Sequence, residues 1–173
     1  MKFFVGIVPN LAIAHQITEI QNRYGNNRLE PHITLRAPVI PLNGEAWIQA
    51  VEQVAHQFSP FEIELTPTGN FGNKTLYLGV RSDDLTRLYN TLIPQLKLYE
   101  PSEPQDREKD YHAHLTLGRA WCGFTPKHFS AMRKLADEYV TSQRVSFIAN
   151  FIRIYYKPDN QKGFQTHKDI QFN

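Results

Sequence analysis

Two copies of one short pattern of chemically capable residues occur far apart in this chain of 173 residues. The first copy runs from His32 to Leu35 in PHITLRAP, and the second runs from His114 to Leu117 in HAHLTLGR. The composition predicts about 0.006 strings of histidine, isoleucine or leucine, threonine and leucine by chance. The repetition therefore indicates two halves of one functional site.

Strand geometry sorts the residues of each copy onto two faces. Because side chains alternate across a strand, His32 and Thr34 share one face, and His114 and Thr116 share another. The aliphatic residues beside them point the opposite way and are expected to anchor each strand in the core. A single histidine in such a place is more often a packed or surface residue than a catalytic one. The repeated pair with its two threonines favours a polar face that meets a ligand.

Two histidines and two threonines suit acid–base chemistry at phosphorus. Imidazole titrates near pH 6.5, so one ring can be neutral while the other is protonated. The neutral ring can activate a nucleophile, and the protonated ring can give its proton to a leaving oxygen. The threonine hydroxyls can donate hydrogen bonds to non-bridging phosphate oxygens. The pattern predicts a phosphodiester held between the two pairs.

Short apolar runs and amphipathic stretches alternate along the chain, with turn residues between them. Asn10 can cap a helix, and Gly44 precedes another. We expect motif strands near residues 32–36 and 113–119, further strands at 2–8, 61–65, 75–81, 144–157 with a break near Asn150, and 169–172, and helices at 10–24, 45–58, 85–96 and 126–139.

These elements predict an α+β fold that forms a single two-lobed domain over residues 1–173. Each half carries a motif strand near a helix, which indicates two pseudo-symmetric lobes of mostly antiparallel sheet, with outer helices, around a central cleft. A polar segment with two prolines lies between Tyr99 and Tyr111 and is a candidate lid beside the second motif.

Composition limits the classes of partner. The net charge of +2 argues against strong nonspecific binding of polyanions, so a nucleic-acid ligand is expected to be short or held at one point. The single cysteine, Cys122, excludes an internal disulfide and is expected to pack in the interior. Pro9 and Asn10 split the apolar N-terminal stretch, which favours a strand over a signal peptide. We expect a cytoplasmic monomer that does not associate with membranes.

On the basis of these motifs, the chain resembles the two-histidine phosphoesterase superfamily, and within it the bacterial 2′-5′ RNA ligase-like cyclic phosphodiesterases. PHITLRAP is similar to the first His-Xaa-Thr motif of the family and HAHLTLGR to the second, while GNFGNKTLYLGV and IRIYYKPDNQKGFQTHKDIQF are similar to its central hairpin and closing strands. In the ligase-named branch the first motif has the form HLTLKF. Here HITL is followed by RAPV, and this difference leaves the exact substrate open.

The resemblance implies a role for each motif residue. His32 and His114 would be catalytic, and Thr34 and Thr116 would bind the substrate phosphate. The family needs no metal or other cofactor, and it opens the 2′,3′-cyclic phosphates of RNA ends or small nucleotides, usually leaving a 2′-phosphate. Some members also join RNA ends through 2′-5′ bonds. We favour His114 as the base and His32 as the acid.

Further contacts with the substrate are expected from residues near the motifs. By strand alternation Arg36 continues the face of His32 and Thr34, so it is a candidate phosphate ligand, although a surface arginine is as good an interpretation. Arg119 falls on the face opposite His114 by the same rule and is a weaker candidate. Three aromatic residues are candidates for stacking on a nucleobase, although such residues more often belong to a core: Tyr111, Tyr155 and Phe71.

Two other functions remain open from the sequence. His112 and His114 share a strand face, and with His32 they would supply three ligands for a hydrolytic zinc ion, although the threonines would then have no role. A noncatalytic protein that binds RNA ends or nucleotides would keep the phosphate pocket without turnover, although the presence of both histidines argues against it.

Overall fold

One curled antiparallel sheet runs through the molecule. In the computed structural model, which describes residues 1–25, 29–102 and 111–173, the strand order is β6-β3-β4-β5-β2-β1-β7-β8. The described strands are β1 (Lys2–Ile7), β2 (Ile33–Val39), β3 (Phe61–Phe71), β4 (Thr75–Arg81), β5 (His114–Arg119), β6 (Val145–Ala149), β7 (Phe151–Lys157) and β8 (Gln165–Gln171). The described helices are α1 (Leu11–Asn22), α2 (Gly44–Ala55), α3 (Asp83–Lys97) and α4 (Pro126–Ser142), with a short 3-10 turn, η1 (Ala120–Cys122).

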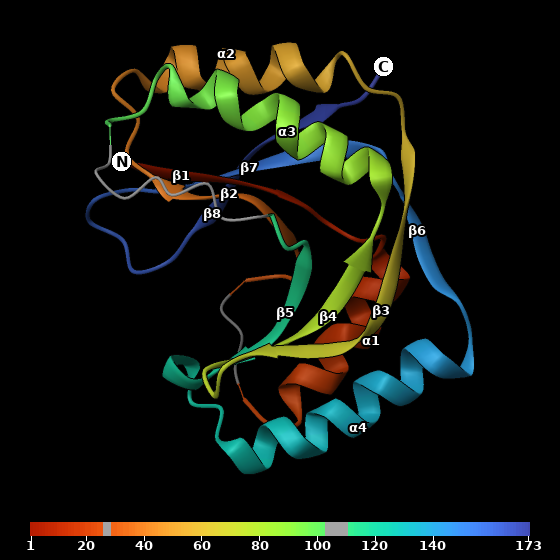
Figure 1. Ribbon diagram of the computed structural model, residues 1–173. Coiled ribbons are helices and arrows are strands. Elements are labelled where there is room, and N and C mark those ends of the chain that lie inside the picture. The colour runs from red at the N-terminus through yellow and green to blue at the C-terminus, as the bar shows by residue number, and fades with distance from the viewer. Residues whose placement is uncertain (26–28, 103–110) are drawn as a thin grey trace.

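The sheet divides into two halves, each covered by a pair of helices (Figure 1). Helices α2 and α3 pack on each other over the half that contains β2, β1, β7 and β8, and α1 and α4 pack on each other over the half that contains β6, β3, β4 and β5. Helix α1 follows β1 in the chain but contacts β5 of the other half. This arrangement confirms the α+β fold with two similarly built halves.

The two halves meet where the two motif strands lie side by side. Strands β2 and β5 are paired through one residue pair, Ile33 with Leu115. The two strands of an antiparallel pair are related to each other by a local two-fold axis that passes through the paired residues. This axis places the residue before the paired position in one strand opposite the residue after it in the other. The sequence echo therefore corresponds to a local two-fold symmetry in space.

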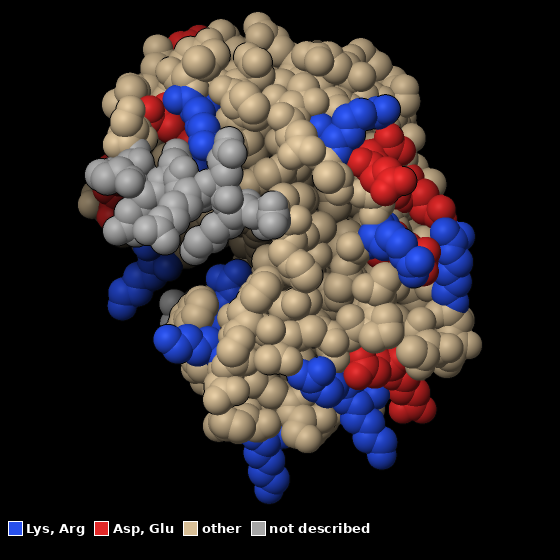
Figure 2. Space-filling model, viewed as in Figure 1, with Lys and Arg blue, Asp and Glu red and all other residues tan. Residues whose placement is uncertain are grey.

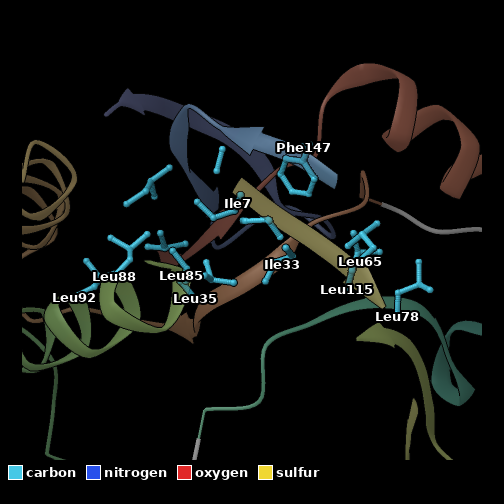
Figure 3. Close-up of a cluster of buried hydrophobic side chains, with 14 of the residues drawn as sticks. Ile7, Ile33, Leu35, Leu65, Leu78, Leu85, Leu88, Leu92, Leu115 and Phe147 are labelled. Atoms are coloured by element: carbon cyan, nitrogen blue, oxygen red, sulfur yellow. The ribbon is translucent and has the colours of Figure 1, made fainter. Parts of the chain in front are cut away.

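The aliphatic residues of both motifs are buried, as the alternation predicts. Ile33 and Leu115 have no exposed surface, and Leu35 is 3% exposed. Figure 3 shows these three side chains in one cluster with leucines of α3, such as Leu88, and with side chains of the neighbouring strands, such as Leu78. Each fully buried aliphatic side chain contributes about 1.5–3 kcal/mol of hydrophobic stabilisation. The core thus holds both motif strands from behind.

Side-chain caps define where the helices begin. The Asn10 Oδ1 accepts a hydrogen bond from the Ile13 amide at 3.0 Å at the start of α1, as the sequence predicts. Thr125 and His128 form a capping box at the start of α4. In α3 the buried residues recur at helical spacing and cover one stripe: Leu85, Leu88, Leu92 and Leu96.

Several boundaries differ from the sequence predictions for identifiable reasons. Strand β3 continues past Pro67, because the proline lies at a shift in the β3–β4 register where it has no partner residue in β4. Cys122 lies in η1 and is exposed, so the prediction that it packs in the interior is wrong. The candidate lid falls largely on residues 103–110, outside the described residues. None of the described helices is both long and apolar enough to cross a membrane.

Candidate active site

The paired motif strands bring the four predicted residues together. Since Ile33 pairs with Leu115 in antiparallel register, His32 lies across from Thr116 and Thr34 lies across from His114. Strand alternation directs all four side chains to the face opposite the buried aliphatic residues. Each of the four is partly exposed. The result is a two-fold arrangement in which each histidine faces the threonine of the other motif.

Each imidazole is oriented by a backbone carbonyl two residues before it. The His32 Nδ1 lies 2.7 Å from the Glu30 carbonyl oxygen, and the His114 Nδ1 lies 2.8 Å from the His112 carbonyl oxygen. A carbonyl oxygen only accepts hydrogen bonds, so Nδ1 is the donor and carries a hydrogen in both rings. The remaining nitrogen, Nε2, is therefore the atom of each ring that is available to exchange a proton.

The surroundings favour the neutral form of both rings. Burial lowers the pKa of His32 most strongly, and the charge of Arg119 lowers it further, while the Glu30 carbonyl and carboxylate raise it in part. Burial also lowers the pKa of His114, and Arg119 and His112 add to that effect. Arg119 is thus close enough to both histidines to influence their protonation.

A bulge in β5 turns Arg119 toward the motif face. Tyr77 of β4 pairs with Thr116, but Leu76, the β4 residue before it, pairs with Gly118, so Leu117 is an extra residue in β5. The bulge reverses the alternation, and the expectation that Arg119 lies opposite His114 is wrong. The Arg119 Nη2 lies 3.5 Å from the Thr116 Oγ1. Within the described part of the chain no carboxylate forms an ion pair with Arg119.

A matching bulge in β2 turns Arg36 away from the motif face. Gly6 pairs with Thr34 and Val5 pairs with Arg36, so Leu35 is the extra residue. Arg36 consequently shares the face of the fully buried Val5, and the expectation that it continues the His32 face is wrong. A phosphate contact from Arg36 remains a prediction that these contacts do not favour.

The Arg36 guanidinium is held by a buried carboxylate. Its Nη2 and Nε lie 2.6 Å and 3.0 Å from the Glu100 Oε2. The Glu100 side chain is 3% exposed and also accepts a hydrogen bond from the Trp47 Nε1 at 2.9 Å. This cluster ties β2 to α2 and to the segment after α3, which is a structural role.

Side chains satisfy the backbone where the two motif strands separate. The Tyr111 hydroxyl donates to the Thr34 carbonyl at 3.2 Å, and the Gln21 Nε2 donates to the Thr116 carbonyl at 3.1 Å. Tyr111 also stacks on Tyr89, with ring centroids 3.8 Å apart, and burial raises the pKa of its hydroxyl. Sequence reasoning did not identify Gln21, because its role depends on a contact between distant segments.

Tyr155 lies in the core next to His32 and helps to fix its position. It is fully buried, stacks on Phe4 with centroids 4.3 Å apart, and donates its hydroxyl to the Glu30 Oε1 at 2.8 Å. Arg153 contacts the same carboxylate oxygen at 2.7 Å. These bonds fix the residue whose carbonyl orients His32. With no exposed surface, Tyr155 offers no face for a nucleobase in this arrangement.

Phe71 has the open surface that a stacking residue needs. It is 42% exposed and meets His114 edge to face, with ring centroids 4.9 Å apart. His112 contacts the same phenyl ring, and its own ring lies 6.3 Å from that of His114. Among the described residues no group of three histidine, cysteine or acidic side chains is arranged to hold a metal ion, so the three-histidine zinc site is not formed.

A surface hollow found in this structure does not coincide with the candidate site. A hollow of about 590 Å³ lies between β1 and α2, lined by residues such as Met1, Ile40 and Ile48, and it contains neither motif. In the sequence, the glycine at position 118 would have been a better indication of the bulge that brings Arg119 to the site. A glycine inside a strand often marks a bulge, and here an added Cβ would lie 2.8 Å from the Phe124 ring.

Comparisons with known proteins agree with this geometry. Residues 9–137 match the family model of the 2′-5′ RNA ligase superfamily. The chain is 30% identical over 133 residues to an RNA 2′,3′-cyclic phosphodiesterase of Archaeoglobus fulgidus, in a match that covers 69% of this chain and 72% of that protein.

Solved structures share the fold at low sequence identity. LigT of E. coli, in a complex with 3′-AMP, is 19% identical with a TM-score of 0.64, and the match covers 99% of this chain and 97% of that one. A Thermus thermophilus protein is 13% identical with a TM-score of 0.68 over the same shares of the two chains. The chain therefore belongs to the 2′-5′ RNA ligase superfamily and is an enzyme of that family, as its paired motif strands led us to expect.

Proposed function

We propose that this enzyme opens 2′,3′-cyclic phosphates at RNA ends or on nucleotides without a metal ion and leaves a 2′-phosphate. The observation that carries the proposal is the two-fold arrangement of two imidazoles, each with Nδ1 bonded to a carbonyl and Nε2 left for proton exchange. The names of the relatives support the substrate class, since one is an RNA cyclic phosphodiesterase and another was solved with 3′-AMP.

The proposed reaction uses the two rings in opposite protonation states. The Nε2 of the neutral histidine takes a proton from water as the water oxygen attacks phosphorus in line with the bond that breaks. The Nε2 of the protonated histidine gives its proton to the departing 3′ oxygen as the bond between that oxygen and phosphorus breaks. The phosphate remains on the 2′ oxygen, and the two rings have exchanged protonation states.

The remaining residues bind the charged phosphate. The Thr34 and Thr116 hydroxyls donate to the two non-bridging oxygens, one from each side of the two-fold axis. Arg119 supplies positive charge next to Thr116 and compensates the charge that builds up on these oxygens during attack. Phe71, beside His114, is suited to hold the terminal base.

One difference between the charged neighbours supports His32 as the acid and His114 as the base. Burial and Arg119 lower the pKa of both rings, and a carboxylate, that of Glu30, opposes this lowering at His32 alone. The charged neighbours of His114 that affect its pKa are Arg119 and His112, and both lower it. A water-activating base is neutral at the start of the reaction, which suits His114.

Product analysis tests the proposal directly. The enzyme is incubated in chelator with cyclic mononucleotides and with RNA that ends in a 2′,3′-cyclic phosphate, and phosphorus NMR identifies the product. We expect 2′-phosphates, and a loss of at least about 10²-fold in turnover for His32→Ala and for His114→Ala. A 3′-phosphate would contradict the regiochemistry, loss of turnover in chelator would contradict metal independence, and binding without turnover at every pH would favour the noncatalytic alternative.

A further inference from the structure

Trp121 is a large aromatic residue left exposed beside the motif face. It lies in η1, directly after β5, and 68% of its surface is exposed. The other tryptophan of the chain, Trp47, is fully buried and bonded to Glu100. An exposed indole contributes nothing to the core, so its position raises the question of what covers it.

Arg119 links this indole to the phosphate-binding residues. The centre of its guanidinium lies 5.2 Å from the centre of the Trp121 ring, and its Nη2 lies 3.5 Å from the Thr116 Oγ1. A single guanidinium therefore separates the indole from a threonine of the motif. The guanidinium meets the ring on one side, and the exposed fraction of the residue leaves room on the other.

The tip of the β3–β4 hairpin and the turn after β5 lie side by side and form one rim of the motif face. Thr75 pairs with Phe71 on one side and with Arg119 on the other, and the Ala120 amide donates to the Lys74 carbonyl at 2.9 Å. Figure 1 shows the turn after β5 beside this hairpin tip. Two exposed aromatic residues, Phe71 and Trp121, thus lie on this rim. Arg119 connects them, since it contacts the Trp121 ring and is paired through Thr75 with the strand that carries Phe71.

This rim also carries positive charge. Arg119 and Lys74 lie between the two aromatic residues. Figure 2 shows Lys and Arg side chains at the lower left of the molecule, in the region where Figure 1 has the hairpin tip and the turn after β5. Aromatic rings interleaved with cations are the usual means of binding single-stranded nucleic acid without reading its sequence.

We propose that Trp121 stacks on the base of the nucleotide that precedes the cyclic-phosphate end, so that an RNA 3′ end of at least two nucleotides is a better substrate than a cyclic mononucleotide. The inference rests on the proposed function and deepens it. Phe71 touches His114 and is placed for the terminal base, whereas Trp121 is one guanidinium farther from the phosphate and is placed for the base before it. A cyclic mononucleotide fills only the first of these two places.

Kinetics with substrates of two lengths tests this assignment. For the wild-type enzyme and for each variant, kcat/KM is measured with a cyclic mononucleotide and with a dinucleotide that ends in a 2′,3′-cyclic phosphate. We expect Trp121→Leu to lower the ratio of kcat/KM for the dinucleotide to that for the mononucleotide by about 5-fold to 150-fold, the range for the loss of one stacked base. Trp121→Phe keeps a ring and should restore most of the ratio.

Two further variants complete the comparison. Phe71→Leu should lower kcat/KM for both substrates and change the ratio little. Ile148→Ala removes an exposed apolar residue on the edge strand β6 and should change neither substrate. The inference is overturned if Trp121→Leu leaves the ratio unchanged, which includes the case in which both substrates suffer equally.

Fluorescence gives a reading that does not depend on turnover. In a His32→Ala enzyme, which keeps the substrate intact, the dinucleotide should quench tryptophan emission and protect it from acrylamide, and the mononucleotide should do neither. Trp47 is buried, so the change reports on Trp121, and Trp121→Phe should abolish it. Binding of the dinucleotide with no change in emission would contradict the inference. Absence of turnover by the wild-type enzyme would instead contradict the proposed function.

Discussion

At the scale of single residues, two arginines next to the motifs have opposite roles. Arg119 lies near Thr116 and affects the protonation of both histidines, whereas Arg36 is bonded to the buried Glu100. We expect Arg119→Gln to lower kcat/KM by about 10²–10³-fold, as for the loss of a donor to a developing oxyanion, with little change in stability. Arg36→Gln should instead lower the free energy of unfolding by about 3–5 kcal/mol, because it leaves a buried carboxylate unpaired.

Activity assays and urea unfolding of the two variants, in parallel, check this division. The double variant Arg36→Met, Glu100→Leu removes both charges and should recover much of the lost stability. Equal losses of activity in the two single variants, at a temperature where both are folded, would contradict the assignment of a catalytic role to Arg119 and a structural role to Arg36.

In the proposed reaction, the protonation of the two histidines sets the pH at which the enzyme works. The active form would have one neutral and one protonated ring, so kcat/KM should peak between the two pKa values of the free enzyme. Burial and Arg119 lower both pKa values from 6.5, so we expect a bell-shaped profile with its maximum below pH 6.5. Arg119→Gln removes a cause of both shifts and should move the maximum upward. A maximum above pH 7 in the wild-type enzyme would contradict this prediction.

At the scale of elements, hydrophobic and polar patterning predicted the strands, the helices and the face of each motif residue up to its threonine. It failed one residue later, because the bulges at Leu35 and Leu117 reverse the alternation that placed Arg36 and Arg119. Both leucines are buried, as in a regular strand, so the pattern of apolar residues does not reveal a bulge. The partners of Arg36 and of the Thr116 carbonyl depend on contacts between distant segments, Glu100 and Gln21, and no local pattern encodes those contacts.

The residue after the β5 bulge, Gly118, packs closely against an aromatic ring. A Cβ at position 118 would lie 2.8 Å from the Phe124 ring, so the ring or the strand has to shift. We expect Gly118→Ala to lower the free energy of unfolding by about 1–3 kcal/mol, as for overpacking, and to reduce turnover because Arg119 follows directly. Gly163→Ala is the control, since an added Cβ there has no atom within 4 Å. Thermal unfolding and kcat/KM are the measurements, and similar behaviour of the two variants would contradict a special role for Gly118.

At the scale of the whole molecule, the candidate active site lies at the line where the two halves meet. The buried pair Ile33 and Leu115 joins the halves on the core side, and the motif histidines and threonines flank it on the other side. Each half thus supplies one histidine and one threonine, and the relative position of the halves fixes the distance between the two Nε2 atoms. The stability of the fold and the geometry of the candidate site therefore depend on the same junction.

This dependence predicts how stability changes in acid. The pKa of His32 is lowered in the folded protein, mainly by burial, so between that pKa and 6.5 the unfolded chain binds more protons than the folded one. The free energy of unfolding therefore falls as the pH drops below 6.5, with a slope of up to about 1.4 kcal/mol per pH unit from this residue. His32→Asn removes the titrating group, so urea unfolding between pH 7.5 and pH 5 should show a shallower slope, whatever the absolute stability of the variant. His15→Asn, at an exposed position on α1, should keep the wild-type slope. Equal slopes for His32→Asn and the wild type would show that His32 does not carry this acid sensitivity.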